Sequence, residues 1–166
     1  MEGITMKVVW LVTHPTAPQN LAQMKDIGPI WGTWETWRVF RTDNVVCADA
    51  IKIRDLLSRA FQTVCNFYMP AGLVSEMQRP LGVQTFLPIS ASSSSLVNLV
   101  NLVAHEADIV LIPQWTELTP VERTEISKII KTSSAQWIEL DVETPLFAHA
   151  NYLLDTTENV VKMLSG

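Results

Sequence analysis

Two glutamates at helical spacing are the side chains best suited to catalysis. Glu122 and Glu125 lie three residues apart, which places both carboxylates on one face of a helix, one turn from each other. They come soon after a predicted strand, so one carboxylate could face a substrate near Gln114. The alternative is structural, because Thr119-Pro120-Val121-Glu122 reads as a capping box with proline at the first helical position.

A run of serines offers hydroxyl groups to an anion. The segment Pro88 to Ser95 leads from a predicted strand into a predicted helix, where free backbone N–H groups and the helix dipole favour negative charge. No glycine lies between Gly82 and Gly166, so both the dinucleotide fingerprint and the Walker A loop are absent. Simple N-capping is the competing interpretation. The serines predicted to contact a ligand are Ser90, Ser92 and Ser93.

Polar and aromatic side chains also follow the other predicted strands. In open α/β sheets, ligands bind outside the carboxyl ends of the parallel strands. The side chains there could stack on a flat ring and hold hydroxyl groups, although strand ends also need caps and turn residues for purely structural reasons. The predicted ligand-binding residues of this group are Thr13, His14, Tyr68, Gln114 and Trp115.

Three of the six tryptophans fall within one short segment. Trp31, Trp34 and Trp37 recur at every third position, with Arg38 alongside, so they could line one side of a helical turn. Three interpretations stay open: a lid over the strand ends, a contact between subunits, and a satellite core. We predict a Trp-rich insertion or lid at about residues 15–41, with Trp34 and Arg38 contributing to the ligand site.

Several other kinds of site are disfavoured by spacing. His14, His105 and His149 match no metal-ligand motif, and we expect neither a metal nor a cofactor. The chain has no G-x-S-x-G nucleophile elbow, which argues against an esterase. Cys47 and Cys65 are isolated from each other and are predicted to be ordinary buried thiols.

The elements that must position these residues alternate between apolar runs and helical stripes. Continuous apolar runs favour a parallel sheet that is covered on both faces. We therefore predict a three-layer, doubly wound α/β domain with a mostly parallel five-stranded sheet. Residues 141–155 fit this scheme poorly. The predicted strands are 7–12, 64–68, 83–87, 109–112 and 137–140, and the predicted helices run from Thr42-Asp43-Asn44 to about Gln62, over 96–107, from Thr119 to about Ile130, and over 156–164.

Composition bounds the function. The chain has 166 residues, of which 48% are hydrophobic and 17% charged, with a net charge of -5, which predicts a single domain over residues 1–166. A charged fraction below the roughly 25% of ordinary domains favours a homo-oligomer. Acidic charge argues against duplex nucleic acid as a partner. The sequence has no apolar run of about 18 residues and no basic leader, so we expect a cytoplasmic protein that does not enter a membrane.

Two resemblances add to this interpretation. The strand ending in Thr13-His14, the stretch Ala107 to Pro113, and the helix bearing Glu122 and Glu125 resemble the nucleoside deoxyribosyltransferase and TIR-like group. That resemblance implies that a buried glutamate after the fourth strand works at the anomeric carbon of a nucleoside. Gln114 to Leu118 stands where the family has an Asp-Gly and Gly-Thr turn. Residues 28–69 are similar to unassigned proteins of tailed bacteriophages, which implies a host cytoplasmic location.

Two functional hypotheses follow. The first is a domain that binds a small-molecule nucleotide or nucleoside, with optional action on the N-glycosidic bond through Glu122 or Glu125. The second is a non-enzymatic, oligomeric interaction or accessory protein, virus-encoded, in which the segment Trp31 to Trp37 forms the contact. Low charge and the concentration of tryptophans motivate the second hypothesis.

Overall fold

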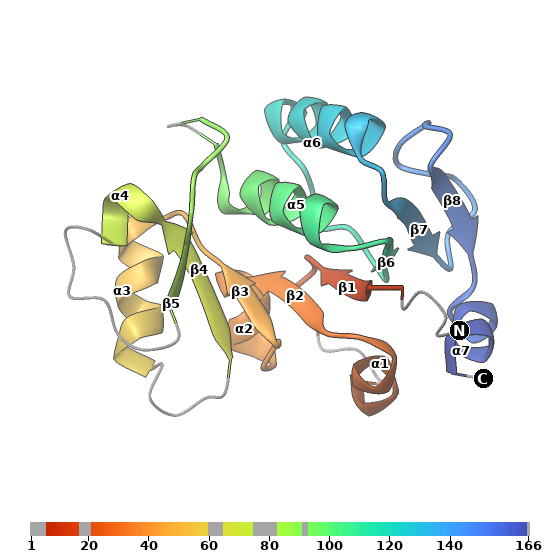
Figure 1. Ribbon diagram of the computed structural model, residues 1–166, viewed down its shortest axis with the longest axis horizontal. Helices are drawn as coiled ribbons and strands as arrows, with labels where there is room; N and C mark the ends of the chain where they lie inside the picture. Colours follow the sequence, from red (N-terminus) through yellow and green to blue (C-terminus); the bar gives the residue numbers. More distant parts are fainter. Residues whose placement is uncertain (1–5, 17–20, 60–64, 75–82, 91–92, 166) are drawn as a thin grey trace, which may run out of the picture.

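The structure is a computed structural model in which one sheet runs through the centre of the chain (Figure 1). It describes residues 6–16, 21–59, 65–74, 83–90 and 93–165. The strands are β1 (Val8–Val12), β2 (Ile30–Thr33), β3 (Asn44–Val46), β4 (Asn66–Pro70), β5 (Val83–Phe86), β6 (Ile109–Ile112), β7 (Gln136–Leu140) and β8 (Tyr152–Asp155). The helices are α1 (Leu21–Ile27), α2 (Trp34–Val39), α3 (Ala50–Arg59), α4 (Ala71–Val74), α5 (Ser95–Glu106), α6 (Pro120–Thr132) and α7 (Thr157–Ser165).

The sheet is parallel and doubly wound. Its strand order is β5-β4-β3-β2-β1-β6-β7-β8, and every neighbouring pair runs in the same direction. From β1 the chain builds outward to β5, then α5 crosses back to β6 on the other side of β1. The predicted three-layer α/β class is confirmed. The described residues form eight strands rather than five, because β2, β3 and β8 lie outside the predicted runs.

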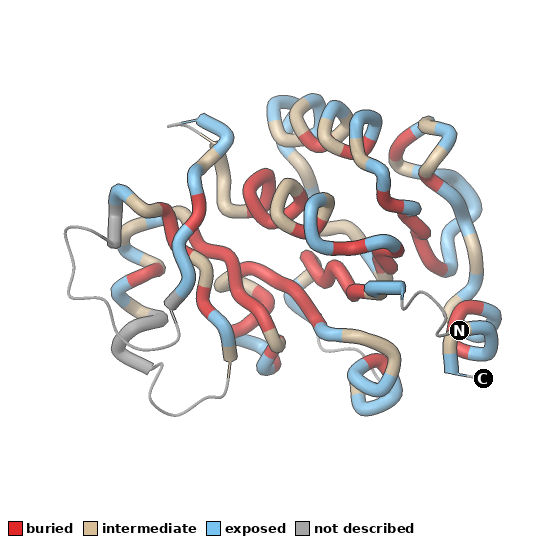
Figure 2. The backbone as a smooth tube through the Cα atoms, in the orientation of Figure 1, coloured by how far each residue is buried: buried red, intermediate tan, exposed pale blue. Residues whose placement is uncertain are grey.

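Helices cover both faces of this sheet. In Figure 1, α5 and α6 lie on one side, and α1, α2, α3 and α7 lie on the other. Val100 of α5 and Ile130 of α6 are fully buried against one face, in a cluster that includes Val9 of β1. Met24 of α1 and Val160 of α7 pack on the opposite face around Trp10. A third cluster joins α2 and α3 to the sheet near β4. Figure 2 shows that burial is concentrated in the central strands.

The segment predicted as an insertion contains a central strand. Within residues 15–41 the structure has α1, β2 and α2, and β2 pairs with β1 on one side and β3 on the other. All four residues of β2 are buried. The entry to β2 is tight, since a Cβ at Gly28 would lie 2.1 Å from the carbonyl oxygen of Val8. This segment is therefore part of the sheet rather than a loop over it.

The start of the helix predicted from Thr42-Asp43-Asn44 was wrong. Asp43 accepts a hydrogen bond of 2.8 Å from the backbone N–H of Ile30, and β3 follows it. The helix α3 begins later, where the Oδ1 atom of Asp49 accepts hydrogen bonds from the N–H groups of Ile51 and Lys52. A tertiary contact thus uses the side chain that the pattern had assigned to a cap.

The capping box predicted at α6 is confirmed. The side chain of Thr119 accepts a hydrogen bond from the backbone N–H of Glu122, and the carboxylate of Glu122 accepts one from the N–H of Thr119. At α5, the Oγ atom of Ser94 accepts a hydrogen bond from the N–H of Val97. Both helices begin next to the carboxyl ends of the central strands, because Ser94 and Glu122 line the same pocket as Thr13 and Thr33.

Candidate functional site

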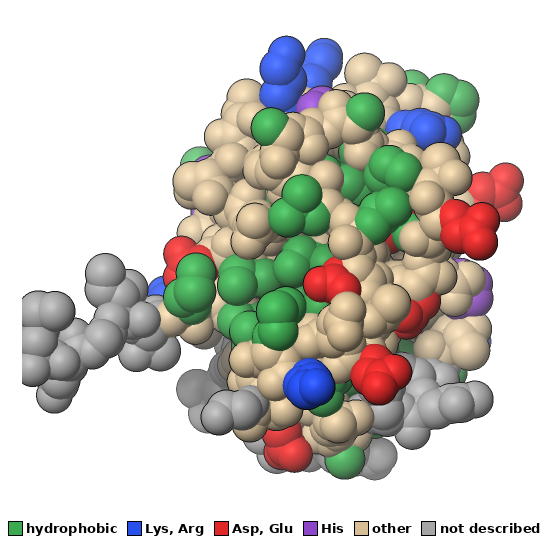
Figure 3. Space-filling model, turned by 90° about the vertical axis from the view of Figure 1, so that its right-hand side faces the viewer, with side chains coloured by type: hydrophobic (Ala, Val, Ile, Leu, Met, Phe, Trp, Pro, Cys, Tyr) green, Lys and Arg blue, Asp and Glu red, His purple; other side chains and the backbone are tan. Residues whose placement is uncertain are grey.

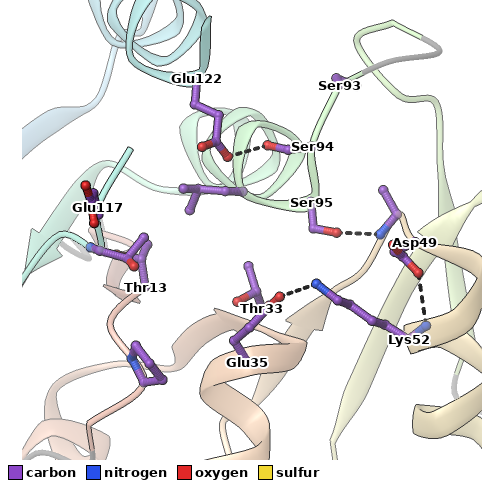
Figure 4. A pocket seen from close by; sticks show the side chains of 14 residues that line it. Thr13, Thr33, Glu35, Asp49, Lys52, Ser93, Ser94, Ser95, Glu117 and Glu122 are labelled. Carbon is purple, nitrogen blue, oxygen red and sulfur yellow. Dashed lines mark hydrogen bonds and ion pairs between the residues drawn. The ribbon is translucent and has the colours of Figure 1, made fainter. Parts of the chain in front are cut away.

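A pocket of about 420 Å³ lies at the carboxyl ends of β1, β2 and β3 (Figure 4). It adjoins the point where the strand order reverses between β1 and β6, which is where ligands bind in doubly wound sheets. Its volume is in the range of small-molecule sites, roughly 300–1,000 Å³. The pocket is lined by Thr13, Pro15, Thr33, Glu35, Ala48, Asp49, Lys52, Ser93, Ser94, Ser95, Leu96, Thr116, Glu117 and Glu122.

Thr13 fixes the wall that β1 and β6 build together. Its hydroxyl donates a hydrogen bond to the carbonyl oxygen of Gln114 and accepts one of 2.9 Å from the N–H of Thr116. Only 3% of Thr13 is exposed, so this bridge is held away from water. The bridge places Thr116 and Glu117 beside the pocket, where Glu117 is exposed.

The serines at the start of α5 join three elements. Ser94 caps α5 with its Oγ atom and donates a hydrogen bond of 2.8 Å to Oε2 of Glu122. Ser95 accepts a hydrogen bond of 2.8 Å from the N–H of Ala48, which follows β3. Ser93 bonds to the backbone of Ser90. These hydroxyl groups serve the fold, as the N-capping interpretation of the serine run requires.

An ion pair forms the opposite side of the pocket. Figure 4 shows Glu35 from the start of α2 and Lys52 from α3 pointing toward each other. Their side chains form a salt bridge through Oε1 and Nζ. Burial alone would raise the pKa of Glu35, but the hydrogen bond and the charge of Lys52 outweigh it and lower that pKa. The hydrogen bond from Lys52 to Glu35 in turn raises the pKa of Lys52. Both groups are therefore charged at neutral pH.

The lining of the pocket carries a net negative charge. Four carboxylates line it, from Glu35, Asp49, Glu117 and Glu122, together with one ammonium group, from Lys52. That ammonium is already paired with Glu35. Such a lining offers many hydrogen-bond acceptors and little net positive charge. It suits a ligand rich in hydroxyl or amino donors and disfavours a phosphate.

The predicted aromatic platform is not in this pocket. Among the described residues that line it, none is aromatic. Trp115 lies just beyond β6 but turns into the fold, where its Nε1 donates a hydrogen bond of 2.8 Å to the hydroxyl of Tyr152. That hydroxyl donates one of 2.7 Å to Oε1 of the buried Glu139. Trp115 also packs edge-on against Phe147. It is a structural residue because its polar atom is used within the core.

Tyr68 lies at a different place from the one predicted. Its ring stacks at 4.9 Å on Trp31. Both rings line a separate hollow that also includes Val8 and Asn66, at the amino ends of the strands. Tyr68 therefore does not share a pocket with Thr13.

The three clustered tryptophans have separate environments. Trp31 belongs to β2 and is 4% exposed, and Trp37 belongs to α2 and is fully buried. Both are core residues, which agrees with the satellite-core interpretation and removes the contact surface that they were proposed to form. Trp34 is half-buried, donates a hydrogen bond to Asp55, and carries the guanidinium of Arg38 at 4.4 Å from its ring. Trp34 and Arg38 lie beside the pocket without lining it.

The remaining predicted residues lie near the pocket or outside it. His14 is half-buried, and its Nδ1 atom has no hydrogen-bond partner within the described part of the chain. Gln114 contributes its carbonyl oxygen to the Thr13 bridge. Ser92 lies outside the described residues. Ser90 and Glu125 do not line the pocket, whereas Ser93 and Glu122 do.

Sequence reasoning missed Thr33, Glu35, Asp49 and Lys52. All four depend on β2 and β3, which are only four and three residues long. The signal that could have found them is the pair of short apolar stretches Ile30-Trp31 and Val45-Val46, each followed by polar residues. Such short runs are hard to separate from loops by periodicity alone.

Comparison with models of protein families, with curated proteins and with solved structures finds no match for this chain. Across the described ranges, no three His, Cys, Asp or Glu side chains are grouped so that they could hold a metal ion. No helix among these residues is both long enough and apolar enough to cross a membrane.

Proposed function

We propose that the carboxylate-lined pocket binds a nucleoside through the hydroxyl groups of its sugar. The observation that carries this proposal is the position of Glu35. In doubly wound dinucleotide-binding domains, an acidic side chain about 20 residues beyond the first βα turn accepts hydrogen bonds from ribose. Glu35 follows β2, the strand next to β1, and lines the pocket. Its carboxylate accepts hydrogen bonds from Lys52, from Thr33 and from its own backbone N–H, and about four lone-pair sites leave room for one more donor.

Charge favours a nucleoside over a nucleotide. A phosphate in this pocket would approach the carboxylates of Asp49, Glu117 and Glu122, and the single ammonium of Lys52 is already neutralised by Glu35. Like charges a few ångströms apart repel, and burial strengthens that repulsion. The resemblance of the sequence to nucleoside deoxyribosyltransferases points to the same class of ligand.

Binding rather than catalysis is the function that the geometry supports. Both carboxylate oxygens of Glu122 accept hydrogen bonds, Oε1 from the N–H of Thr119 and Oε2 from the hydroxyl of Ser94. Glu125 does not line the pocket. Glu122 thus has a structural role and Glu125 lies outside the pocket, so the proposal does not include cleavage of the N-glycosidic bond.

A thermal-shift panel tests this function. Ribonucleosides should raise the melting temperature, since a ligand at about 100 times its dissociation constant adds about 2.7 kcal/mol of stability. Their 5′-monophosphates and 2′,3′-dideoxy analogues should give clearly smaller shifts. Free ribose is included in the panel, because a shift as large as that of the nucleosides would indicate a site for the sugar alone. If nucleosides cause no shift, or if dideoxy analogues match ribonucleosides, the proposal is wrong.

A further inference from the structure

A second hollow lies between α6 and the segment that connects β7 to β8. Its volume is about 570 Å³, and it shares no lining residue with the carboxylate pocket. One wall is the solvent side of α6, and the other is residues 146–149. We call it the α6 groove. It is lined by Arg123, Thr124, Ser127, Lys128, Lys131, Leu146, Phe147, Ala148 and His149.

The α6 groove concentrates positive charge in an acidic protein. Arg123, Ser127 and Lys131 follow one another at four-residue spacing, so they form a row about 12 Å long on one helix face. Lys128 is exposed beside this row. Figure 3 shows Lys or Arg side chains and a histidine gathered at the top of the molecule, the end at which α6 lies in Figure 1, whereas the acidic side chains in this view lie lower.

These cations have no partner of opposite charge. In the part of the chain that the structure describes, the ion pairs are Lys7 with Glu106, Lys25 with Asp43, and Lys52 with Glu35. None of them involves a cation of the α6 groove. Several unpaired cations along one groove repel one another, and a bound anion relieves that repulsion.

The groove also holds oriented polar groups. The guanidinium of Arg123 donates a hydrogen bond of 3.2 Å to the carbonyl oxygen of Leu146, which fixes it at the wall while its other N–H groups stay available. The Oγ atom of Ser127 and the Nε2 atom of His149 lie 2.8 Å apart. When the His149 ring donates in this pair, the hydroxyl proton of Ser127 is free to point at a ligand.

We propose that the α6 groove binds a diphosphate or longer phosphate chain of a small molecule. A guanidinium fork, two point-like ammonium groups and a hydroxyl are the donors that proteins use for phosphate oxygens. The row along α6 is too long for one phosphate and fits two or more in sequence. This site is independent of the proposed nucleoside pocket, and its charged side chains are basic where those of the pocket are mainly acidic.

Calorimetric titration of the full chain with sodium pyrophosphate at low ionic strength tests this site. We expect saturable binding that is tighter than the binding of inorganic phosphate or of sulfate. The double substitution Lys128→Gln with Lys131→Gln should weaken it by about tenfold or more, because it removes two charged donors. Ser127→Ala should weaken it by a smaller factor without changing the charge.

The matched control is Arg54→Gln with Lys162→Gln, which removes the same charge from exposed sites on α3 and α7. It should leave the affinity for pyrophosphate within about twofold of that of the native chain, because salt screens exposed charges that lie far from the groove. Circular dichroism of both double variants is used to check that they are folded. Equal weakening by the two double variants would contradict a site in the α6 groove. Tighter binding of an oligoglutamate peptide than of pyrophosphate would contradict the phosphate ligand.

Discussion

The hydroxyl of Ser94 donates a hydrogen bond of 2.8 Å to Oε2 of Glu122, and this contact joins the first turn of α5 to the first turn of α6. The two residues are 28 positions apart in sequence, and their helices precede and follow β6 along the chain. Each also caps its own helix. The pair thereby holds the upper rim of the carboxylate pocket in place (Figure 4).

Ser94→Ala should destabilise the fold. The substitution removes an N-cap, which is worth about 0.5–2 kcal/mol, and it also removes one of the donors to Glu122. Urea denaturation followed by circular dichroism measures the loss. Thr124→Ala is the control, because that hydroxyl donates a hydrogen bond to the carbonyl oxygen of Pro120 within α6 and joins no second element among the described residues. A loss for Ser94→Ala no greater than for Thr124→Ala would contradict the role of this rim.

Gly28→Ala should be among the most damaging single substitutions. A Cβ at this position would lie 2.1 Å from the carbonyl oxygen of Val8, so β1 or the entry to β2 must move. We expect a loss of roughly 2 kcal/mol or more, as for other overpacked sites. At Gly72 an added Cβ meets nothing within 4 Å, so Gly72→Ala should be neutral or slightly stabilising. Similar melting temperatures for the two variants would contradict the packing of β2 in the sheet.

The sheet class could be predicted from the sequence, but its middle could not. The runs at β1 and β6 are continuously apolar, and α6 carries its capping box in four consecutive residues. The strand β2 has four residues, as β6 does, but Gly32 and Thr33 end its apolar run after two residues, and it is a strand because it pairs on both sides. Pairing between distant segments decides such short strands, and local pattern does not record it.

The pocket lies at the edge of the sheet where the sequence predicts a ligand site, and only some of the predicted residues line it. Thr13, Ser93 and Glu122 line one pocket because the carboxyl end of β1 and the amino ends of α5 and α6 lie at the same edge of the sheet. Trp115 and Tyr68 were assigned to the same place because they follow or end strands. Their half-buried rings instead contact Tyr152 and Trp31, and the direction of a side chain depends on packing that one sequence does not reveal.

Tyr152→Phe should cost about 1–3 kcal/mol of stability. The phenol hydroxyl accepts a hydrogen bond from Trp115 and donates one to the buried carboxylate of Glu139, so its removal leaves both groups short of a partner. Chemical denaturation measures the loss. Tyr68→Phe is the control, since the hydroxyl of Tyr68 makes no hydrogen bond within the described ranges and should change stability by less than about 0.5 kcal/mol. Equal losses would contradict the buried network.

The two thiols should resist alkylation in the native state. Burial raises the pKa of Cys47 from 9.0 to about 11, and burial followed by the charge of Asp43 raises the pKa of Cys65 from 9.0 to about 12. Only the thiolate reacts, so iodoacetamide at about pH 8 should label the native protein far more slowly than the unfolded chain. Mass spectrometry of the labelled peptides measures both rates.

The same shifts set an alkaline limit on stability. The folded state holds the thiol protons more tightly than the unfolded chain, whose thiol pKa is the ordinary 9.0. Stability from these groups is therefore full below about pH 9 and falls as the pH rises toward 11 and beyond. Native labelling at the unfolded rate, or stability that rises over this range, would contradict the burial of Cys47 and the partial burial of Cys65.

Calorimetric titration of a ribonucleoside into the native chain and into Glu35→Gln tests the central claim most directly. Loss of a charged hydrogen bond costs about 1.5–3 kcal/mol, so the variant should bind at least about tenfold more weakly. Glu143→Gln, which removes the same charge from an exposed loop, should bind as the native chain does. Equal affinities for the native chain and Glu35→Gln, or tighter binding of the 5′-monophosphate than of the nucleoside, would contradict the account.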